Sequence, residues 1–236
     1  MTLIAIHREL ARAVDRLRFA PPVAYVYNPL SYARPLVEAY LLRWGRGTRE
    51  VILLGMNPGP FGMAQTGVPF GDPAMVRDWL RLDGKVGKPP HEHPKRPVLG
   101  LDSPRREVSG ARLWGWARDR FDTPERFFRK IFVANWCPLA FLDAGGRNVT
   151  PDRLPAAERA ALAAPCDRAL RAMAAELRPR FVVGVGAFAA GRAREALAGT
   201  GIVVGTMLHP SHASPRANRG WVEQAERDLR ALGMTL

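Results

Sequence analysis

Short apolar runs alternate along this chain with longer stretches whose apolar positions recur at helical spacing. The apolar runs predict strands at 50–55, 131–135, 181–185 and 202–207. The amphipathic stretches predict helices at 3–18, 34–44, 109–120, 151–178 (one helix or a pair), 187–198 and 218–232. Two more helices are expected, one opened by Thr123-Pro124 and a short one after Asp72-Pro73. This alternation indicates an α/β fold, a three-layer α/β/α sandwich with a central, mostly parallel four-stranded sheet.

Composition favours one domain spanning residues 1–236. The chain is 47% hydrophobic, enough for a sizeable core, and it has no internal repeat. The segment 81–108 mixes basic residues with prolines and glycines, and we expect a surface loop there. No stretch approaches the length of a membrane span, and the amino terminus lacks the features of a signal peptide, so we expect a cytoplasmic protein.

The charge balance points to a phosphate-rich partner. The formal net charge is +13, and all but four of the 35 basic residues are arginines. Such a positive field favours nucleic acid, although a solvated cationic surface would have the same composition. Two cysteines cannot hold a four-cysteine cluster. His91 and His93 have metal-like spacing without companion ligands, so we expect a solvated loop, no metal and no cofactor.

The segment Gly55–Asp72 is the most distinctive part of the sequence. It follows a buried strand and contains five glycines and three prolines, with Asn57 at its beginning. Glycine lets a ligand approach the backbone, and proline stiffens a loop. Because ligands of open α/β sheets bind at the carboxyl ends of the strands, this segment is predicted to form a binding site.

Three polar side chains follow strands that lie far apart in the sequence. Asn57 follows the first strand, Asn135 ends the second and His209 follows the fourth. In a parallel sheet these ends share one edge, so the three residues are expected to converge. Two amides and an imidazole suit a planar heterocycle with donors and acceptors on its rim. Taken singly, each asparagine is equally typical of a turn or a cap. A lone histidine in a loop with a flanking proline is more often structural than catalytic.

The segments Gly55–Asp72 and His209–Trp221 together resemble the two signature motifs of the single-strand-selective monofunctional uracil-DNA glycosylases, of the uracil-DNA glycosylase superfamily. The resemblance extends to four shorter segments, namely Tyr27–Ala33, Val108–Arg112, Asn135–Leu142 and Asn148–Pro151. It implies that the target base is rotated out of the DNA and read in a pocket. In the second motif the family has Pro-Arg directly after the serine, whereas three residues intervene here. Which residue fills the gap left by the flipped base therefore stays open.

The resemblance also implies roles for individual residues. Asn57 positions the attacking water, and His209 stabilises the departing uracil anion at O2. Phe70 stacks on the uracil ring, Asn135 pairs with its O4 and N3–H edge, and Met56 contributes a backbone group. Gly59 and Met63 border the C5 side of the base. No lysine or terminal amine is implicated, so the enzyme is expected to be monofunctional.

Two loops are predicted to contact the DNA backbone. The loop after the fourth strand offers hydroxyl, imidazole and guanidinium groups for phosphates, from Ser211, His212, Ser214, Arg216 and Arg219. The other candidate contains Arg147, Asn148 and Thr150 before an expected helix, whose free N–H groups would bind phosphate. For each loop, a surface connection with a helix cap is the alternative.

These inferences predict a monomeric hydrolase that removes uracil and C5-modified uracils, such as 5-hydroxymethyluracil, from single- and double-stranded DNA to initiate base excision repair. One alternative is a superfamily variant that acts mainly on deaminated purines. A non-catalytic DNA-binding module would keep the same basic surface. A small-nucleotide-binding protein is disfavoured by the basic charge and by the absence of a phosphate-binding loop.

Overall fold

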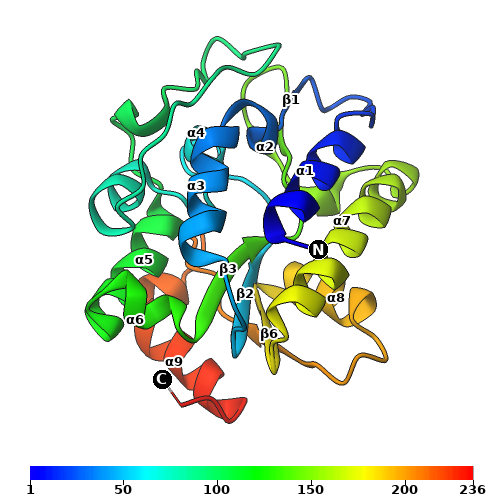
Figure 1. Cartoon of the computed structure of the whole chain (residues 1–236). Helices are drawn as coiled ribbons and strands as arrows, with labels where there is room; N and C mark the ends of the chain where they lie inside the picture. The colour runs from blue at the N-terminus through cyan, green and yellow to red at the C-terminus, as the bar shows by residue number, and fades with distance from the viewer. Residues whose placement is uncertain (236) are drawn as a thin grey trace.

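Four parallel strands form the central sheet of the molecule. Figure 1 labels β2, β3 and β6 of this sheet. The computed structural model describes residues 1–235. The central sheet has the order β3-β2-β6-β7, and its strands are β2 (Val51–Gly55), β3 (Ile131–Asn135), β6 (Phe181–Val185) and β7 (Val203–Met207). Every residue of β2 and β6 is buried, as expected for inner strands covered on both faces. The four predicted strands are confirmed to within one residue.

Helices cover both faces of this sheet, which confirms the three-layer sandwich. One layer contains α1 (Leu3–Val14), α3 (Arg34–Trp44), α7 (Ala156–Leu177) and α8 (Ala187–Ala196). The other contains α5 (Val108–Phe121) and α9 (Trp221–Ala231), and α6 (Pro124–Phe128) packs at the β3 edge. Thr123 caps α6 as predicted, because its side chain accepts a hydrogen bond from the Arg126 N–H.

Several helix boundaries differ from the sequence prediction. The stretch 151–178 contains a 3₁₀ turn (Pro151–Arg153) followed by a single α-helix, α7. Helix α9 likewise follows a 3₁₀ turn (Ala217–Arg219), and α1 ends at Val14. The short helix expected after Asp72-Pro73 is a π-helical turn (Met75–Trp79).

A small antiparallel sheet was not predicted. It has the order β1-β4-β5 and consists of β1 (Tyr25–Tyr27), β4 (Ala140–Leu142) and β5 (Asn148–Val149). The short helices α2 (Pro29–Tyr32) and α4 (Met63–Thr66) were also missed. Segments of two to four residues are too short to show a period, and their pairing is decided by distant contacts.

The segment 81–108 forms a surface loop, as predicted, with one 3₁₀ turn (Gly100–Asp102). The solvated environment expected for His93 is wrong. Its side chain is buried, Nε2 lies 3.1 Å from the Ala144 carbonyl oxygen, and Nδ1 accepts the Lys95 N–H. This histidine therefore ties the loop to the β4–β5 connection. Among residues 1–235, no helix is long and apolar enough to span a membrane.

The strand order creates a crevice at the carboxyl edge of the sheet. After β2 the chain continues to β3 on one side, and then returns to β6 on the other side of β2. The loops that follow β2 and β6 therefore diverge, and open α/β sheets bind ligands at such switch points. Register brings Gly55 of β2 directly opposite Asn135 of β3, so the first two polar strand ends are neighbours.

Candidate active site

A pocket of about 480 Å³ opens at this edge of the sheet. Its walls come from the loop after β2, the end of β3, the β5 segment, the start of α5 and the loop after β7. All seven residues predicted for catalysis and base binding line it: Met56, Asn57, Gly59, Met63, Phe70, Asn135 and His209. The convergence expected from the three strand ends is therefore present in the structure.

Asn57 is oriented by the backbone around it. Its Nδ2 donates to the Leu139 carbonyl oxygen over 3.2 Å and lies 3.5 Å from the Pro58 carbonyl oxygen. Both neighbours are acceptors, so the amide nitrogen must face them and Oδ1 is left as an acceptor. A half-buried amide held in this way can accept a hydrogen bond from a water molecule in the pocket.

Asn135 and Phe70 meet over Gly55. A Cβ at Gly55 would lie 2.2 Å from Asn135 Oδ1 and 2.7 Å from Phe70 Cε2. Any residue larger than glycine at position 55 would therefore displace the Asn135 or Phe70 side chain. The Asn135 Nδ2 points to Met63 Sδ over 3.1 Å. Gly55 thus allows an amide edge and an aromatic ring to share one wall of the pocket, a role that was not predicted from the sequence.

Phe70 is held in an unusual backbone conformation. Its φ is 52°, in the left-handed region that bulky residues rarely adopt. The Trp114 indole donates to the Phe70 carbonyl oxygen over 3.0 Å, and α5 approaches so closely that a Cβ at Gly110 would overlap this oxygen. Strain of this kind persists where the surroundings fix it, and here it sets the position of the ring.

His209 presents a neutral imidazole to the pocket. The Ser211 N–H donates to Nδ1 over 3.1 Å, so the ring proton of the neutral form lies on Nε2. Burial lowers the pKa of His209 to about 4. The Phe70 ring centroid lies 6.0 Å from that of His209. At pH 7 this side chain therefore carries a single N–H donor and no charge.

The loop after β7 is braced by α5 and by its own side chains. Arg112 donates through Nη1 to the Pro210 carbonyl oxygen over 3.1 Å and through Nη2 to Asn218 Oδ1 over 2.9 Å. Asn218 in turn donates to the His212 carbonyl oxygen over 2.8 Å. These bonds fix the loop that carries His209. No pattern in the sequence around Arg112 predicted this role.

A buried carboxylate organises the opposite end of the Gly55–Asp72 segment. Asp72 has no exposed surface and accepts from Arg106 Nε over 2.8 Å and from the Glu107 N–H over 2.9 Å. Glu107 caps α5 by accepting from the Ser109 and Gly110 N–H groups, and its methylenes pack against Gly62. Burial raises the pKa of Glu107. Single polar residues in an irregular loop gave no pattern that could have predicted this arrangement.

The predicted DNA-contacting residues fall into two groups. Asn148, Thr150, Ser211 and His212 line the pocket, whereas Arg147, Ser214, Arg216 and Arg219 lie outside it. The helix start expected after Thr150 is wrong: Thr150 makes no capping bond, Asn148 lies in β5, and α7 begins only at Ala156. The N-terminus of an α-helix therefore does not support phosphate binding at this loop. Phosphate contacts by the side chains of Arg147, Asn148 and Thr150 remain a prediction.

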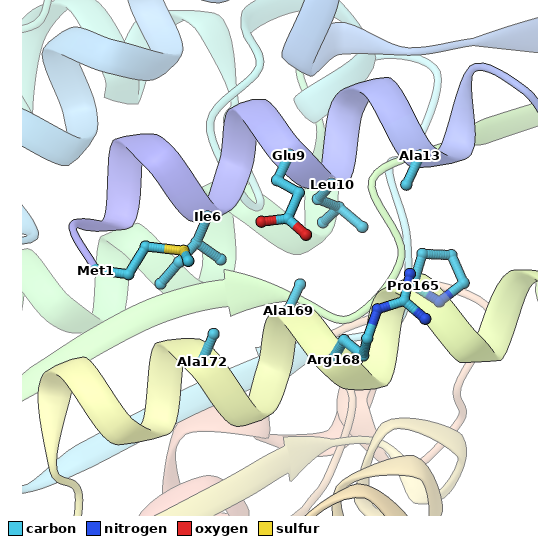
Figure 2. Close-up of a pocket in the computed structure, with 9 residues that line it drawn as sticks. All are labelled: Met1, Ile6, Glu9, Leu10, Ala13, Pro165, Arg168, Ala169 and Ala172. Carbon is cyan, nitrogen blue, oxygen red and sulfur yellow. The ribbon is translucent and has the colours of Figure 1, made fainter.

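Two other features play no part in this site. Gly184 of β6 approaches α8 so closely that a Cβ would lie 2.2 Å from the Ala190 nitrogen, so this glycine allows close helix–strand packing. A hollow of about 150 Å³ between α1 and α7 is lined mainly by aliphatic groups, and also by Glu9 and Arg168 (Figure 2). Within residues 1–235, no group of three or more His, Cys, Asp or Glu side chains could hold a metal ion.

Comparison of the amino-acid sequence with known proteins shows the family of this chain. The sequence model described as "Uracil DNA glycosylase superfamily" matches residues 43–230. The single-strand selective monofunctional uracil-DNA glycosylase of Rattus norvegicus is 52% identical over 223 residues, which are 94% of this chain and 80% of the relative. The protein of that name from Bos taurus is 52% identical over 221 residues, covering 93% and 81%.

A solved structure supports the same fold. The crystal structure of the wild-type SMUG2 protein of Pedobacter heparinus superposes with a TM-score of 0.67 at 18% identity and covers 97% of both chains. The sequence matches are closer and carry the assignment. This chain belongs to the uracil-DNA glycosylase superfamily and, within it, to the single-strand-selective monofunctional uracil-DNA glycosylases.

Proposed function

We propose that this chain hydrolyses the N-glycosidic bond of uracil and of C5-modified uracils in single- and double-stranded DNA, and so initiates base excision repair. The observation that carries this proposal is the convergence of Asn57, Asn135 and His209 with the Phe70 ring in one pocket. The names of the relatives, which specify uracil-DNA glycosylase, support the same reaction.

Uracil would be recognised by its edge and its face. The Asn135 amide offers an acceptor to N3–H and a donor to O4, whereas cytosine has these groups exchanged. The Phe70 ring supplies a stacking surface. The Met56 N–H donates to no group among the described residues, so it is free to bind a base carbonyl. Together these groups would bind uracil and disfavour cytosine.

Bond cleavage would rely on charge stabilisation rather than on a strong base. The C1′–N1 bond breaks, its electron pair leaves with uracil, and a sugar cation of oxocarbenium character remains. The His209 Nε2–H would donate to O2 of the uracil anion. One donor of this type contributes about 2.7–4 kcal/mol.

Water completes the hydrolysis. Asn57 Oδ1 accepts a hydrogen bond from a water whose oxygen forms the new bond to C1′, and the water proton passes to solvent. An amide is too weak a base to deprotonate water, so the glycosidic bond must break early. The protein contributes orientation of the water, which is itself a large part of catalysis.

Space beside Gly59 supports activity on C5-modified uracils. A Cβ at Gly59 would meet a single neighbour, Glu107 Oε1 at 4.0 Å. A C5 hydroxymethyl group could fill this space and donate to a nearby oxygen. Gly59→Ala should therefore keep uracil excision and reduce 5-hydroxymethyluracil excision, since the fold tolerates the added methyl. Equal rates for both bases in Gly59→Ala would contradict this role.

The proposal is tested with oligonucleotides that carry uracil, 5-hydroxymethyluracil, thymine, hypoxanthine or xanthine, each single-stranded and annealed. We expect release of the first two bases in both forms. Preferred release of hypoxanthine or xanthine would favour the deaminated-purine alternative. DNA binding without release of any base, unchanged in Asn57→Ala and His209→Ala, would favour a non-catalytic module. We also propose that the protein acts as a monomer, because one chain supplies every group named above.

A further inference from the structure

A pair of anchored arginines lies at the mouth of the pocket, in the loop that precedes α5. Arg106 lines the pocket, and its Nε is fixed by the buried Asp72, while 59% of its side-chain surface remains exposed. The neighbouring Arg105 is exposed and lies over the Phe61 ring, with Cζ 5.0 Å from the ring centroid. Phe61 also lines the pocket. The arginines and the flipped base would therefore share one opening.

Both guanidinium groups are held in ways that leave donors free. A cation–π contact uses the flat face of Arg105, so its in-plane N–H groups remain available. Among residues 1–235, Arg105 forms no ion pair with a carboxylate. Arg106 uses Nε for Asp72, and its two outer nitrogens have no hydrogen-bond partner in the described chain. Donors that are anchored in advance lose less entropy when they bind a partner.

A third arginine, Arg96, contacts the same Phe61 ring as Arg105. Arg96 also lies over Phe61, with Cζ 5.2 Å from the ring centroid, but its Nη1 donates to the Lys95 carbonyl oxygen and it is half-buried. Arg96 therefore helps to hold the ring and adds positive charge. The Phe61 ring joins the Gly55–Asp72 segment to the segment 81–108 through its contacts with Arg96 and Arg105. This contact gives the basic loop a fixed place beside the pocket.

We propose that Arg105 and Arg106 bind the phosphates of nucleotides that flank the flipped base. The segment 81–108 would then be a DNA-binding element in addition to the two loops predicted from the sequence. The proposal rests on the proposed function. When a base is bound in the pocket, the phosphates on either side of its nucleotide must lie near the opening where these arginines are found. Arginine suits the task, since its planar fork matches the oxygens of a phosphate. These contacts do not depend on base pairing, so they would serve single strands as well as duplexes.

The test compares Arg105→Gln with a matched control, Arg180→Gln. Arg180 is also exposed and lies over a phenylalanine ring, Phe181, at 4.8 Å, but it precedes β6 at the opposite end of the strand from the pocket. The probe is a single-stranded oligonucleotide with 2′-fluoro-2′-deoxyuridine, which resists cleavage. Fluorescence anisotropy gives the Kd at salt concentrations between about 0.05 and 1 M. Over this range the screening of charge–charge interactions becomes steadily stronger.

The logarithm of the association constant falls linearly with the logarithm of the salt concentration. Loss of one phosphate contact on single-stranded DNA makes this slope less steep by about 0.7. Arg105→Gln should therefore bind about fivefold more weakly at 0.1 M salt, with the difference vanishing near 1 M. Arg105→Lys should restore most of the slope, because it keeps the charge. Replacing single phosphates by methylphosphonates should locate the contact, since Arg105→Gln will be insensitive to one of these replacements.

Two results would overturn the proposal. One is a wild-type slope and Kd in Arg105→Gln, and the other is an equal change in Arg180→Gln, which would reveal an effect of net charge alone. The proposed function fails differently, namely if the wild-type protein releases no uracil. The binding measurement needs no catalysis, so the two failures are distinguishable.

Discussion

The protonation state of His209 leads to the sharpest kinetic prediction. Its Nδ1 accepts the Ser211 N–H, and burial lowers its pKa to about 4. The imidazole is therefore a neutral Nε2–H donor throughout the physiological range. A cationic imidazolium would need a proton on Nδ1, which would break the bond from Ser211. Stabilisation of the uracil anion should thus depend on a neutral donor.

The magnitude follows from the loss of one preorganised donor. Removing such a group from an active site costs about 2.7–4 kcal/mol, equivalent to about 10²–10³ in rate. We expect His209→Ala to lower the single-turnover rate of uracil excision by this factor at pH 7.5. Binding of the uncleavable oligonucleotide should change little, because the donor acts mainly on charge that develops during bond cleavage.

The pH dependence separates a neutral from a cationic histidine. The excision rate should not titrate with the ordinary histidine pKa near 6.5, and loss of the neutral donor should occur only towards pH 4. The free energy of unfolding should also depend on pH because of the lowered pKa of His209. The unfolded chain binds more protons than the folded chain between about pH 6.5 and 4, so the free energy of unfolding falls as pH is lowered through that window. His209→Ala should lack this contribution.

Single-turnover excision between pH 4.5 and 8.5, together with ¹⁵N chemical shifts of the histidine ring, would test these expectations. An acid limb centred near pH 6.5 that is absent from His209→Ala would refute the neutral-donor mechanism. A rate for His209→Ala within about threefold of the wild-type rate would equally exclude the expected contribution.

Three further substitutions test the construction of the site. Gly55→Ala places a Cβ 2.2 Å from Asn135 Oδ1 and 2.7 Å from Phe70 Cε2, so excision should fall about 100-fold with little loss of thermal stability; near-wild-type activity would contradict this packing. Asn57→Ala should lower the single-turnover rate about 100-fold while the Kd for uncleavable DNA stays unchanged, and a change in Kd alone would argue against a role in water positioning. Asp72→Ala leaves buried N–H groups unpaired, so urea unfolding should show a loss of about 3 kcal/mol; a loss below about 1 kcal/mol would refute the bracing role.

The central sheet could be predicted because each of its strands is a short apolar run. The runs at 51–55 and 181–185 are buried on both faces, which leaves a strong signal in the sequence. The strand ends then placed Asn57, Asn135 and His209 at one edge without any knowledge of side-chain contacts. Chain order and parallel pairing were sufficient for that inference.

Other parts of the site depend on contacts that no local pattern encodes. The strands of the small antiparallel sheet are two or three residues long, and β1 pairs with β4 across more than a hundred residues. The helix predicted after Thr150 begins only at Ala156, because a 3₁₀ turn intervenes. The Asp72–Arg106 pair joins two irregular segments. Tertiary packing decides such features, so they become visible only in the structure.

The most direct test is a crystal structure of the protein bound to single-stranded DNA that contains 2′-fluoro-2′-deoxyuridine. The flipped uracil should lie against Phe70, with the Asn135 amide at its O4 and N3 edge and His209 Nε2 within hydrogen-bond distance of O2. A water on Asn57 Oδ1 should face C1′. A uracil bound outside this pocket, or one whose O2 lies far from His209, would contradict the proposal that the three strand ends form one catalytic site.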